Sequence, residues 1–239
     1  MPWDFWLILV FLGVVIPWRG QVRLKKLLAL PAVDTKDKLV IYAATIAFQW
    51  LLCGAVAWRA LARGISIEQL GLGRRNWLTI LAAAAVGAVL IGVLQWLNLR
   101  RIGKMEGVGP ERLRNLTKRL LPVNLVEYLP YAALAITAGV CEEFIYRGFV
   151  LGAFDRAGLP VWAAVILSSV LFGLAHAYQG RGGIVSTGLF GIALALGRLA
   201  FASLVPVMAW HAGLDLAAGV AAPRYLLDRA GGADLQEMK

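Results

Sequence analysis

Two adjacent glutamates and one arginine stand at the end of an apolar run, Leu129 to Val140. A carboxylate removed from water is costly unless it is paired or protonated. Glu143 and Arg147 are four residues apart, so on a helix they share one face in the order that favours an ion pair. Glu142 is rotated by about 100° and has no cation at helical spacing. The spacing therefore predicts that Glu143 pairs with Arg147 and that Glu142 is available for chemistry.

The only two histidines of the chain, His176 and His211, also lie in apolar segments. Phe172 precedes His176 by four residues and Asp215 follows His211 by four, so each pair shares one face of a helix. Ionisable groups inside a membrane bundle are functional-site candidates. We therefore group both histidines and Asp215 with Glu142 as candidate site residues.

These groups could support several kinds of chemistry, and their spacing alone does not choose among them. Glu142 could act as a general base on a water that His176 helps to hold. His211, oriented or protonated with the help of Asp215, could then donate to a developing oxyanion. Two histidines and a glutamate are also a catalytic zinc ligand set. The same groups could instead relay protons or ions, or form only a structural clasp that joins helices.

Other protease designs fit this sequence poorly. It contains no His-Glu-x-x-His segment, the common zinc-binding helix. Ser168, Ser169 and Ser186 lack a Gly-x-Ser-x-Gly setting. Cys141 adjoins Glu142, but apolar surroundings disfavour its thiolate. Serine and cysteine nucleophiles are therefore not favoured.

The composition indicates a protein of the lipid bilayer. Of the 239 residues, 60% are hydrophobic and 16% are charged, compared with about 45–50% and about 25% in soluble domains. The formal net charge is +10, yet Lys and Arg lie mainly between apolar segments, where they orient helices and meet anionic headgroups. We therefore expect an integral membrane protein that does not bind nucleic acid.

Seven apolar segments approach the length of a membrane helix. We place them at residues 3–18, 39–60, 77–97, 125–154, 160–178, 184–200 and 204–221. In the polar stretch between the third and the fourth, Leu113, Leu116 and Leu120 recur at helical spacing, which predicts an amphipathic helix on the membrane surface. The predicted fold is an all-α polytopic membrane bundle of about seven segments plus this interfacial helix.

We expect one integral membrane domain in three parts. Residues 1–124 hold the first helices and the amphipathic loop, residues 125–222 hold the candidate site residues, and residues 223–239 form a solvated tail.

The loops after the first and third segments carry more Lys and Arg than the loop after the second, which weakly favours the cytoplasm for both. A signal peptide has basic residues before its apolar run. In this chain the basic residues follow the run, at Arg19, Arg23, Lys25 and Lys26. We therefore expect a retained anchor helix with its N-terminus outside.

Three short motifs occur in order, Glu142-Glu143-x-x-x-Arg147, Phe172-x-x-x-His176 and His211-x-x-x-Asp215. Together they resemble the CPBP family, the CAAX-prenyl-protease and bacteriocin-processing intramembrane glutamic endopeptidases, also called the Abi family. Residues 68–72, Glu-Gln-Leu-Gly-Leu, are similar to a segment often found ahead of these domains. The motifs cover about residues 125–221, and the first three helices carry none.

This resemblance implies an all-helical membrane core that cleaves peptides with no metal or other cofactor. Glu142 and His176 would activate the water, and His211 with Asp215 would form the oxyanion site. The supporting residues would be Glu143, Arg147 and Phe172. The third motif of the family typically ends in Asn, whereas an ionised Asp215 cannot donate a hydrogen bond. Asp215 would therefore have to be protonated, or act by orienting His211.

The main hypothesis is a glutamate-type intramembrane endopeptidase in a bacterial or archaeal cell membrane. Its partners would be the lipid bilayer and a membrane-anchored or lipidated protein substrate. Two alternatives stay open. One is a zinc-dependent membrane protease that uses the same groups, and the other is a non-catalytic membrane scaffold or immunity-type protein.

Overall fold

The computed structural model describes residues 1–73 and 76–227, and every regular element in that part of the chain is helical. The first helical segment joins α1 (Trp3–Val10), the π-helical η1 (Phe11–Val15) and α2 (Ile16–Ala29). A later one joins α6 (Leu125–Glu143), the π-helical η2 (Phe144–Val150) and α7 (Leu151–Arg156). The other elements are α3 (Thr35–Ala62), α4 (Trp77–Ile102), α5 (Val108–Leu120), α8 (Val161–Ala175), the short η3 (Ala177–Gln179), α9 (Arg181–Phe201), α10 (Val205–Ala222) and η4 (Pro223–Leu227).

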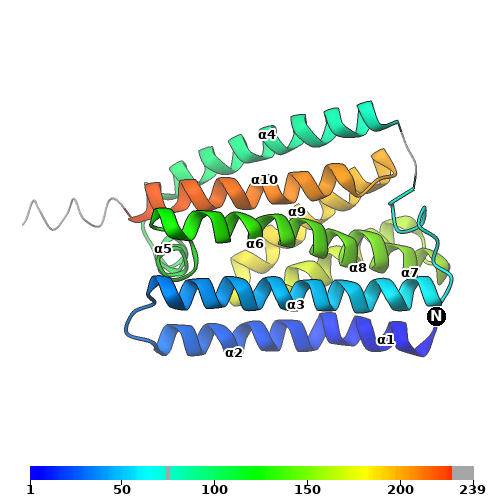
Figure 1. Cartoon of the computed structure of the whole chain (residues 1–239), viewed down its shortest axis with the longest axis horizontal. Coiled ribbons are helices and arrows are strands. Elements are labelled where there is room, and N and C mark those ends of the chain that lie inside the picture. The colour runs from blue at the N-terminus through cyan, green and yellow to red at the C-terminus, as the bar shows by residue number, and fades with distance from the viewer. Residues whose placement is uncertain (74–75, 228–239) are drawn as a thin grey trace, which may run out of the picture.

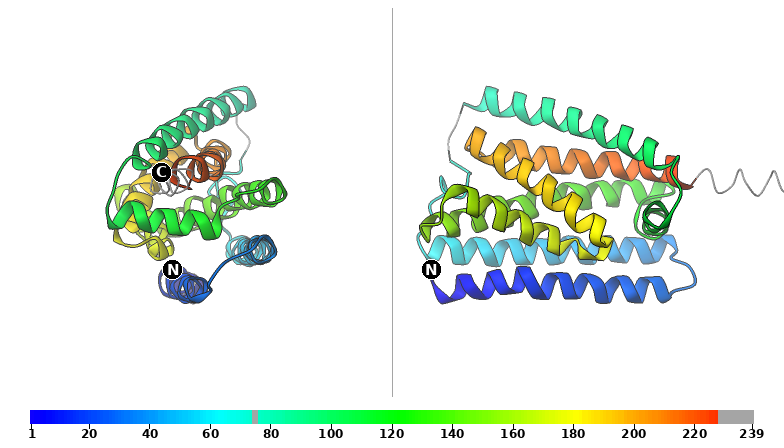
Figure 2. Two further views of the ribbon diagram at one scale, coloured as in Figure 1. Left: turned by 90° about the vertical axis from the view of Figure 1, so that its left-hand side faces the viewer. Right: turned by 180° about the vertical axis from the view of Figure 1, so that it is seen from behind.

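The long helices lie lengthwise beside one another, and α5 crosses one end of the bundle, where Figure 1 shows it end-on. The chain bends by 105° between α5 and the helix that follows it. The ends of α2 and α4 and the start of α3 lie at the same end of the bundle as α5 (Figure 2). The two loops expected in the cytoplasm therefore share one end, and their sidedness stays a prediction.

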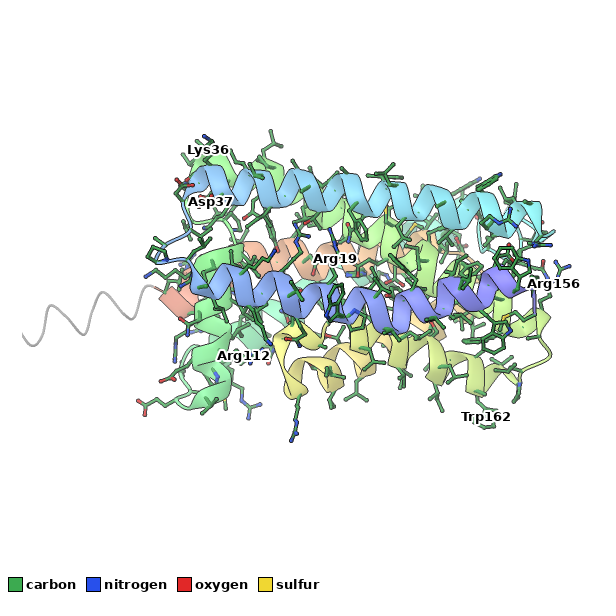
Figure 3. All side chains as sticks on the ribbon, turned by 90° about the horizontal axis from the view of Figure 1, so that it is seen from below. Arg19, Lys36, Asp37, Arg112, Arg156 and Trp162 are labelled. Atoms are coloured by element: carbon green, nitrogen blue, oxygen red, sulfur yellow. The ribbon has the colours of Figure 1, made fainter. Side chains whose placement is uncertain are left out.

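The polytopic all-α bundle is confirmed, but the count of seven membrane segments is not. Five helical segments are long and apolar enough to cross a bilayer, or six if the bent pair of α5 and Leu125–Arg156 forms one span. The apolar helix α8 has only 15 residues, fewer than the roughly 20 that a bilayer needs. Large apolar side chains on the outside of the bundle fit a lipid environment, as Trp162 on α8 shows with 68% of its surface exposed (Figure 3).

The boundaries predicted at the two ends of the chain were wrong. The first helix continues to Ala29 instead of ending at Trp18, so the four basic residues lie within it. Long cationic side chains can lay their stems along apolar surface, and the Arg19 guanidinium stacks 3.9 Å above the ring centroid of Phe48. Residues 223–227 of the expected solvated tail instead form η4, in which Pro223 and Leu226 are buried. Residues 228–239 of that tail lie outside the described residues.

Helices α3 and α6 run parallel, and a buried ion pair sets their register. Lys38 Nζ lies 3.0 Å from Glu127 Oε2, and both side chains are almost fully enclosed. Lys38 also donates to the Leu121 carbonyl at 2.7 Å, which ties the α5–α6 connection to the same point. One turn further along, the rings of Tyr42 and Tyr131 meet edge to face with centroids 5.8 Å apart. These contacts fix which residues of α3 face α6.

Lys38→Met is expected to lower the free energy of unfolding by about 3–5 kcal/mol, because it leaves Glu127 buried without its cation. Thermal unfolding in detergent measures the loss. Lys36→Met is the matched control, since Lys36 lies two residues earlier and is exposed (Figure 3). Equal unfolding temperatures for the two variants would contradict the role given to the buried pair.

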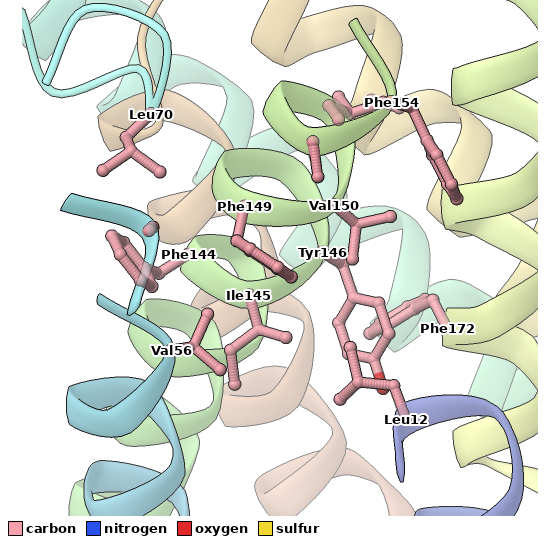
Figure 4. Close-up of a cluster of buried hydrophobic side chains, with 14 of the residues drawn as sticks. Leu12, Val56, Leu70, Phe144, Ile145, Tyr146, Phe149, Val150, Phe154 and Phe172 are labelled. Carbon is pink, nitrogen blue, oxygen red and sulfur yellow. The ribbon is translucent and has the colours of Figure 1, made fainter. Parts of the chain in front are cut away.

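The largest cluster of buried apolar side chains surrounds η2 (Figure 4). All seven residues of η2 are buried, and Phe149 meets the ring of Phe5 edge to face at 4.9 Å. Leu12 from η1, Val56 from α3 and Phe172 from α8 enter the same cluster. The pair of glutamates at the end of α6 is therefore joined directly to the densely packed centre of the molecule.

Candidate active site

Glu142 and His176 face one another across the interface of α6 and α8. The distance from Glu142 Oε2 to His176 Nε2 is 4.0 Å, and about a fifth of each side chain is exposed. This separation is too long for a direct hydrogen bond. It leaves two polar atoms that face one another without a direct bond. The structure thus brings together two residues that are 34 positions apart in the sequence.

His176 is held by the end of its own helix. It is the C-cap of α8 and not part of the continuous helix to Tyr178 that the sequence predicts. Its Nδ1 lies 2.9 Å from the carbonyl oxygen of Phe172, one of the carbonyls that a helix end leaves unpaired. A carbonyl can only accept, so Nδ1 carries the proton, and Nε2 of a neutral ring is the acceptor that faces Glu142.

Glu143 makes the predicted ion pair with Arg147 and a second contact that the sequence does not reveal. Its Oε1 lies 3.1 Å from Arg147 Nη1, and both side chains are fully buried. The same oxygen lies 2.8 Å from His211 Nδ1. Glu143 therefore joins the motif of α6 to the motif of α10, in addition to neutralising Arg147.

The close approach of α6 and α10 makes this contact possible. A Cβ atom on Gly139 would lie 2.7 Å from the Met208 carbonyl oxygen and 2.9 Å from the Ala212 nitrogen. Only glycine fits between the two backbones without displacing one of them. Because Gly139 precedes Glu143 by one turn of α6, this packing sets the distance across which Glu143 meets His211.

Phe172 forms the shared wall of the site. Its ring centroid lies 4.8 Å from that of His176 and 5.6 Å from that of His211, both edge to face. The Arg147 guanidinium lies 4.1 Å from the same centroid, within the range of a cation–π contact. A Cβ on Gly191 of α9 would come within 2.8 Å of Arg147 Nη2, so α9 also closes on this guanidinium. The supporting residues Arg147 and Phe172 therefore pack as one unit beneath both histidines.

Asp215 lies near His211 but does not hold it in place. Its Oδ2 is 3.7 Å from His211 Nε2, beyond hydrogen-bond distance. The sequence suggested that Asp215 orients His211, whereas the direct contact of the ring is with Glu143. The backbone carbonyl of Asp215 accepts a hydrogen bond from the Tyr131 hydroxyl at 3.0 Å, which anchors this turn of α10 to α6.

Gln49 belongs to the site but was missed in the sequence. Its Nε2 donates to Glu142 Oε1 at 2.6 Å from the middle of α3. The available signal was a lone amide within the apolar segment 39–60, because polar groups in such a helix tend to mark an interior contact.

Two helices outside the three motifs hold the turn that follows His176. Gln21 of α2 donates to the Ala177 carbonyl at 2.7 Å. Arg112 of α5 donates to the Tyr178 carbonyl, also at 2.7 Å, and Figure 3 shows Arg112 beside this part of the chain. The amphipathic helix α5 thus contacts the site region through the backbone of η3.

Arg112→Ala is expected to speed hydrogen–deuterium exchange of the backbone amides at residues 177–180 by about fivefold, because one hydrogen bond contributes about 1 kcal/mol to local stability. Mass spectrometry of the protein in detergent measures the rate. Arg114→Ala is the control, since Arg114 lies on the same helix but donates to the Met105 carbonyl. Unchanged exchange at η3 would show that α5 does not hold this turn.

Metal binding was one alternative for these groups. Within residues 1–73 and 76–227, His, Cys, Asp and Glu side chains form no group of three or more that could hold a metal ion. His211 directs Nδ1 to Glu143 and Nε2 toward Asp215.

The fold and the site define an integral membrane protein with a glutamate–histidine centre inside a helical bundle. Residues 124–217 match the family model described as Rce1-like, type II CAAX prenyl endopeptidase. This match supports the CAAX-protease family for the segment that carries all three motifs, and residues 1–123 lie outside it. Comparisons with curated proteins and with solved structures give no match.

Proposed function

We propose that this protein is an intramembrane endopeptidase that hydrolyses a peptide bond in a membrane-anchored or lipidated protein, with Glu142 activating the water. The observation that carries the proposal is the 4.0 Å separation of Glu142 Oε2 and His176 Nε2. The family match supports the coarser part, a protease of the CAAX type acting on a protein substrate in a bilayer. The glutamate mechanism is our inference from the geometry.

A water oxygen about 2.8 Å from each of these two acceptors would reach both. Glu142 would take one proton of that water as general base, while the other O–H stays on the water oxygen and donates a hydrogen bond to His176 Nε2. The water oxygen would bond to the peptide carbonyl carbon, and the carbonyl π electrons would move to its oxygen. Collapse of this intermediate would break the C–N bond, with the proton passing from Glu142 to the leaving nitrogen.

His211 would stabilise the developing oxyanion. Its two ring nitrogens lie 2.8 Å from Glu143 Oε1 and 3.7 Å from Asp215 Oδ2. Carboxylates only accept hydrogen bonds, so a doubly protonated His211 suits both neighbours. Its Nε2–H would then be available to an oxyanion, and donors of this kind act most strongly where water is excluded. In this role the ionised Asp215 would balance the positive charge of His211. It would not need to donate a hydrogen bond, as an Asn at this position could.

The test is to incubate the purified protein with membranes and identify new peptide termini by mass spectrometry, with a Glu142→Gln preparation in parallel. Fragments released only by the wild-type protein support the proposal and also identify the substrate. A chelator titration distinguishes the zinc alternative, because cleavage lost on chelation and restored by zinc would replace the metal-free mechanism. A scaffold or immunity-type protein would instead keep its cellular function after Glu142→Ala.

A further inference from the structure

Within residues 1–73 and 76–227, Gln49 is the one side chain outside the family-matched segment that hydrogen-bonds Glu142. The bond is short, 2.6 Å, and joins α3 to the end of α6. A carboxylate cannot donate, so the amide must turn its amino group toward Glu142. Charge-assisted bonds of this type are stronger than those between neutral groups.

This contact occupies one carboxylate oxygen and leaves the other for chemistry. Glu142 Oε1 accepts from Gln49, and Oε2 is the oxygen that faces His176. Among the described residues, Oε2 has no side-chain or backbone hydrogen-bond partner. A glutamate side chain has several rotatable bonds, so anchoring one oxygen restricts where the other can point. A reacting group that moves by 1 Å can lose about 10²-fold in rate.

The position of Gln49 is itself fixed by the interface of α3 and α6. Cys53 lies one turn beyond Gln49 on the same face of α3 and packs in the same buried apolar cluster as Cys141, the neighbour of Glu142. Trp50 Nε1 donates to Thr137 at 3.3 Å. Both contacts oppose sliding or rotation of α3 relative to α6. The amide is therefore held in place by packing and not only by its own bond.

We propose that Gln49 is a positioning residue that orients Glu142 for the hydrolysis described above. The inference rests on the proposed function. It makes α3 part of the active centre, although α3 lies outside the segment that matches the family. The catalytic unit then includes at least one helix of the N-terminal half.

The experiment compares cleavage kinetics of the full-length protein in detergent. Gln49→Met keeps the length of the side chain without a donor, and Gln49→Asn keeps the amide but shortens its reach. Both are expected to lower kcat by about tenfold to a hundredfold, with KM within about twofold of wild type, because orientation of the base affects the transition state more than substrate binding. Thr45→Val is the matched control, since Thr45 lies one turn earlier and bonds only its own helix, at the Ile41 carbonyl.

Several outcomes would overturn the proposal. These are kcat within about twofold of wild type in both Gln49 variants, an effect confined to KM, or an equal loss in Thr45→Val. If Gln49→Met does not yield folded protein, Gln49→Asn decides, because it preserves a polar group in α3. Wild type and Glu142→Gln are measured alongside. If they cleave equally, the proposed function fails, and if only Glu142→Gln is inactive while both Gln49 variants are active, the present inference alone fails.

Discussion

Replacing Glu142 with Gln is expected to lower the rate of peptide cleavage by about 10²- to 10⁴-fold, the range that a general base contributes. The amide has nearly the same shape as the carboxylate but cannot take a proton from water. Its carbonyl oxygen can still accept the hydrogen bond from Gln49, so the interface of α3 and α6 should remain intact. The variant should therefore elute and unfold as the wild type does while losing its activity.

The measurement is the initial rate on an identified substrate, normalised to folded protein from size-exclusion chromatography. Glu111→Gln provides the control, because Glu111 is an exposed glutamate on α5. Its rate should match that of the wild type. Cleavage by Glu142→Gln at a wild-type rate would remove Glu142 from the chemistry and return the site to a structural clasp.

Replacing Arg147 with Met is expected to have the largest effect on stability. Arg147 and Glu143 are both fully buried, and Glu143 would lose its guanidinium partner and keep only the contact with His211. Removing one member of such a pair lowers the free energy of unfolding by about 3–5 kcal/mol. The stacking of the guanidinium on Phe172 would be lost as well. We therefore expect little folded protein after extraction, and activity lost for a different reason than in Glu142→Gln.

Arg147→Lys should restore little of this stability, since an ammonium cannot stack flat on a ring as a guanidinium does. Arg63→Met is the comparison, because Asp4 would keep its contact with Arg59 and the Arg63 side chain is 36% exposed. Unfolding temperature and yield of monodisperse protein in detergent report both effects. A stable, monodisperse Arg147→Met protein would show that Glu143 is neutralised by another route.

Local spacing predicted which side chains are neighbours on one helix, although His211 and Asp215, also four apart, stay beyond hydrogen-bond distance. Glu143 and Arg147 are four apart, and the covalent geometry of a helix brings them together whatever surrounds it. For the same reason Phe172 and His176 are neighbours, although His176 proves to be the cap of α8 instead of an interior residue. Helix caps depend on where the chain must turn, and the apolar pattern does not mark that residue.

Contacts between different helices could not be predicted from spacing along the chain. The sequence supplied no reason for Glu143 to meet His211, which is 68 residues away, or for Gln49 to reach Glu142 across 93 residues. These distances depend on how closely the backbones pack, as at Gly139 between α6 and α10, and on the register that Lys38 and Glu127 impose on α3. Packing of this kind sums many contacts along whole helices, so no short motif encodes it.

The amino-acid sequence by itself determined that this is an all-helical membrane protein. It also identified the glutamates, histidines and arginine that lie in apolar segments and need partners there, because burying such groups alone is costly. The tertiary structure alone decided which side chains of other helices the two glutamates meet. Glu142 turns one oxygen to Gln49 and the other toward His176, and Glu143 bridges Arg147 and His211. The physical reason is that helical periodicity fixes the direction of a side chain, whereas the packing of helices fixes what that side chain meets.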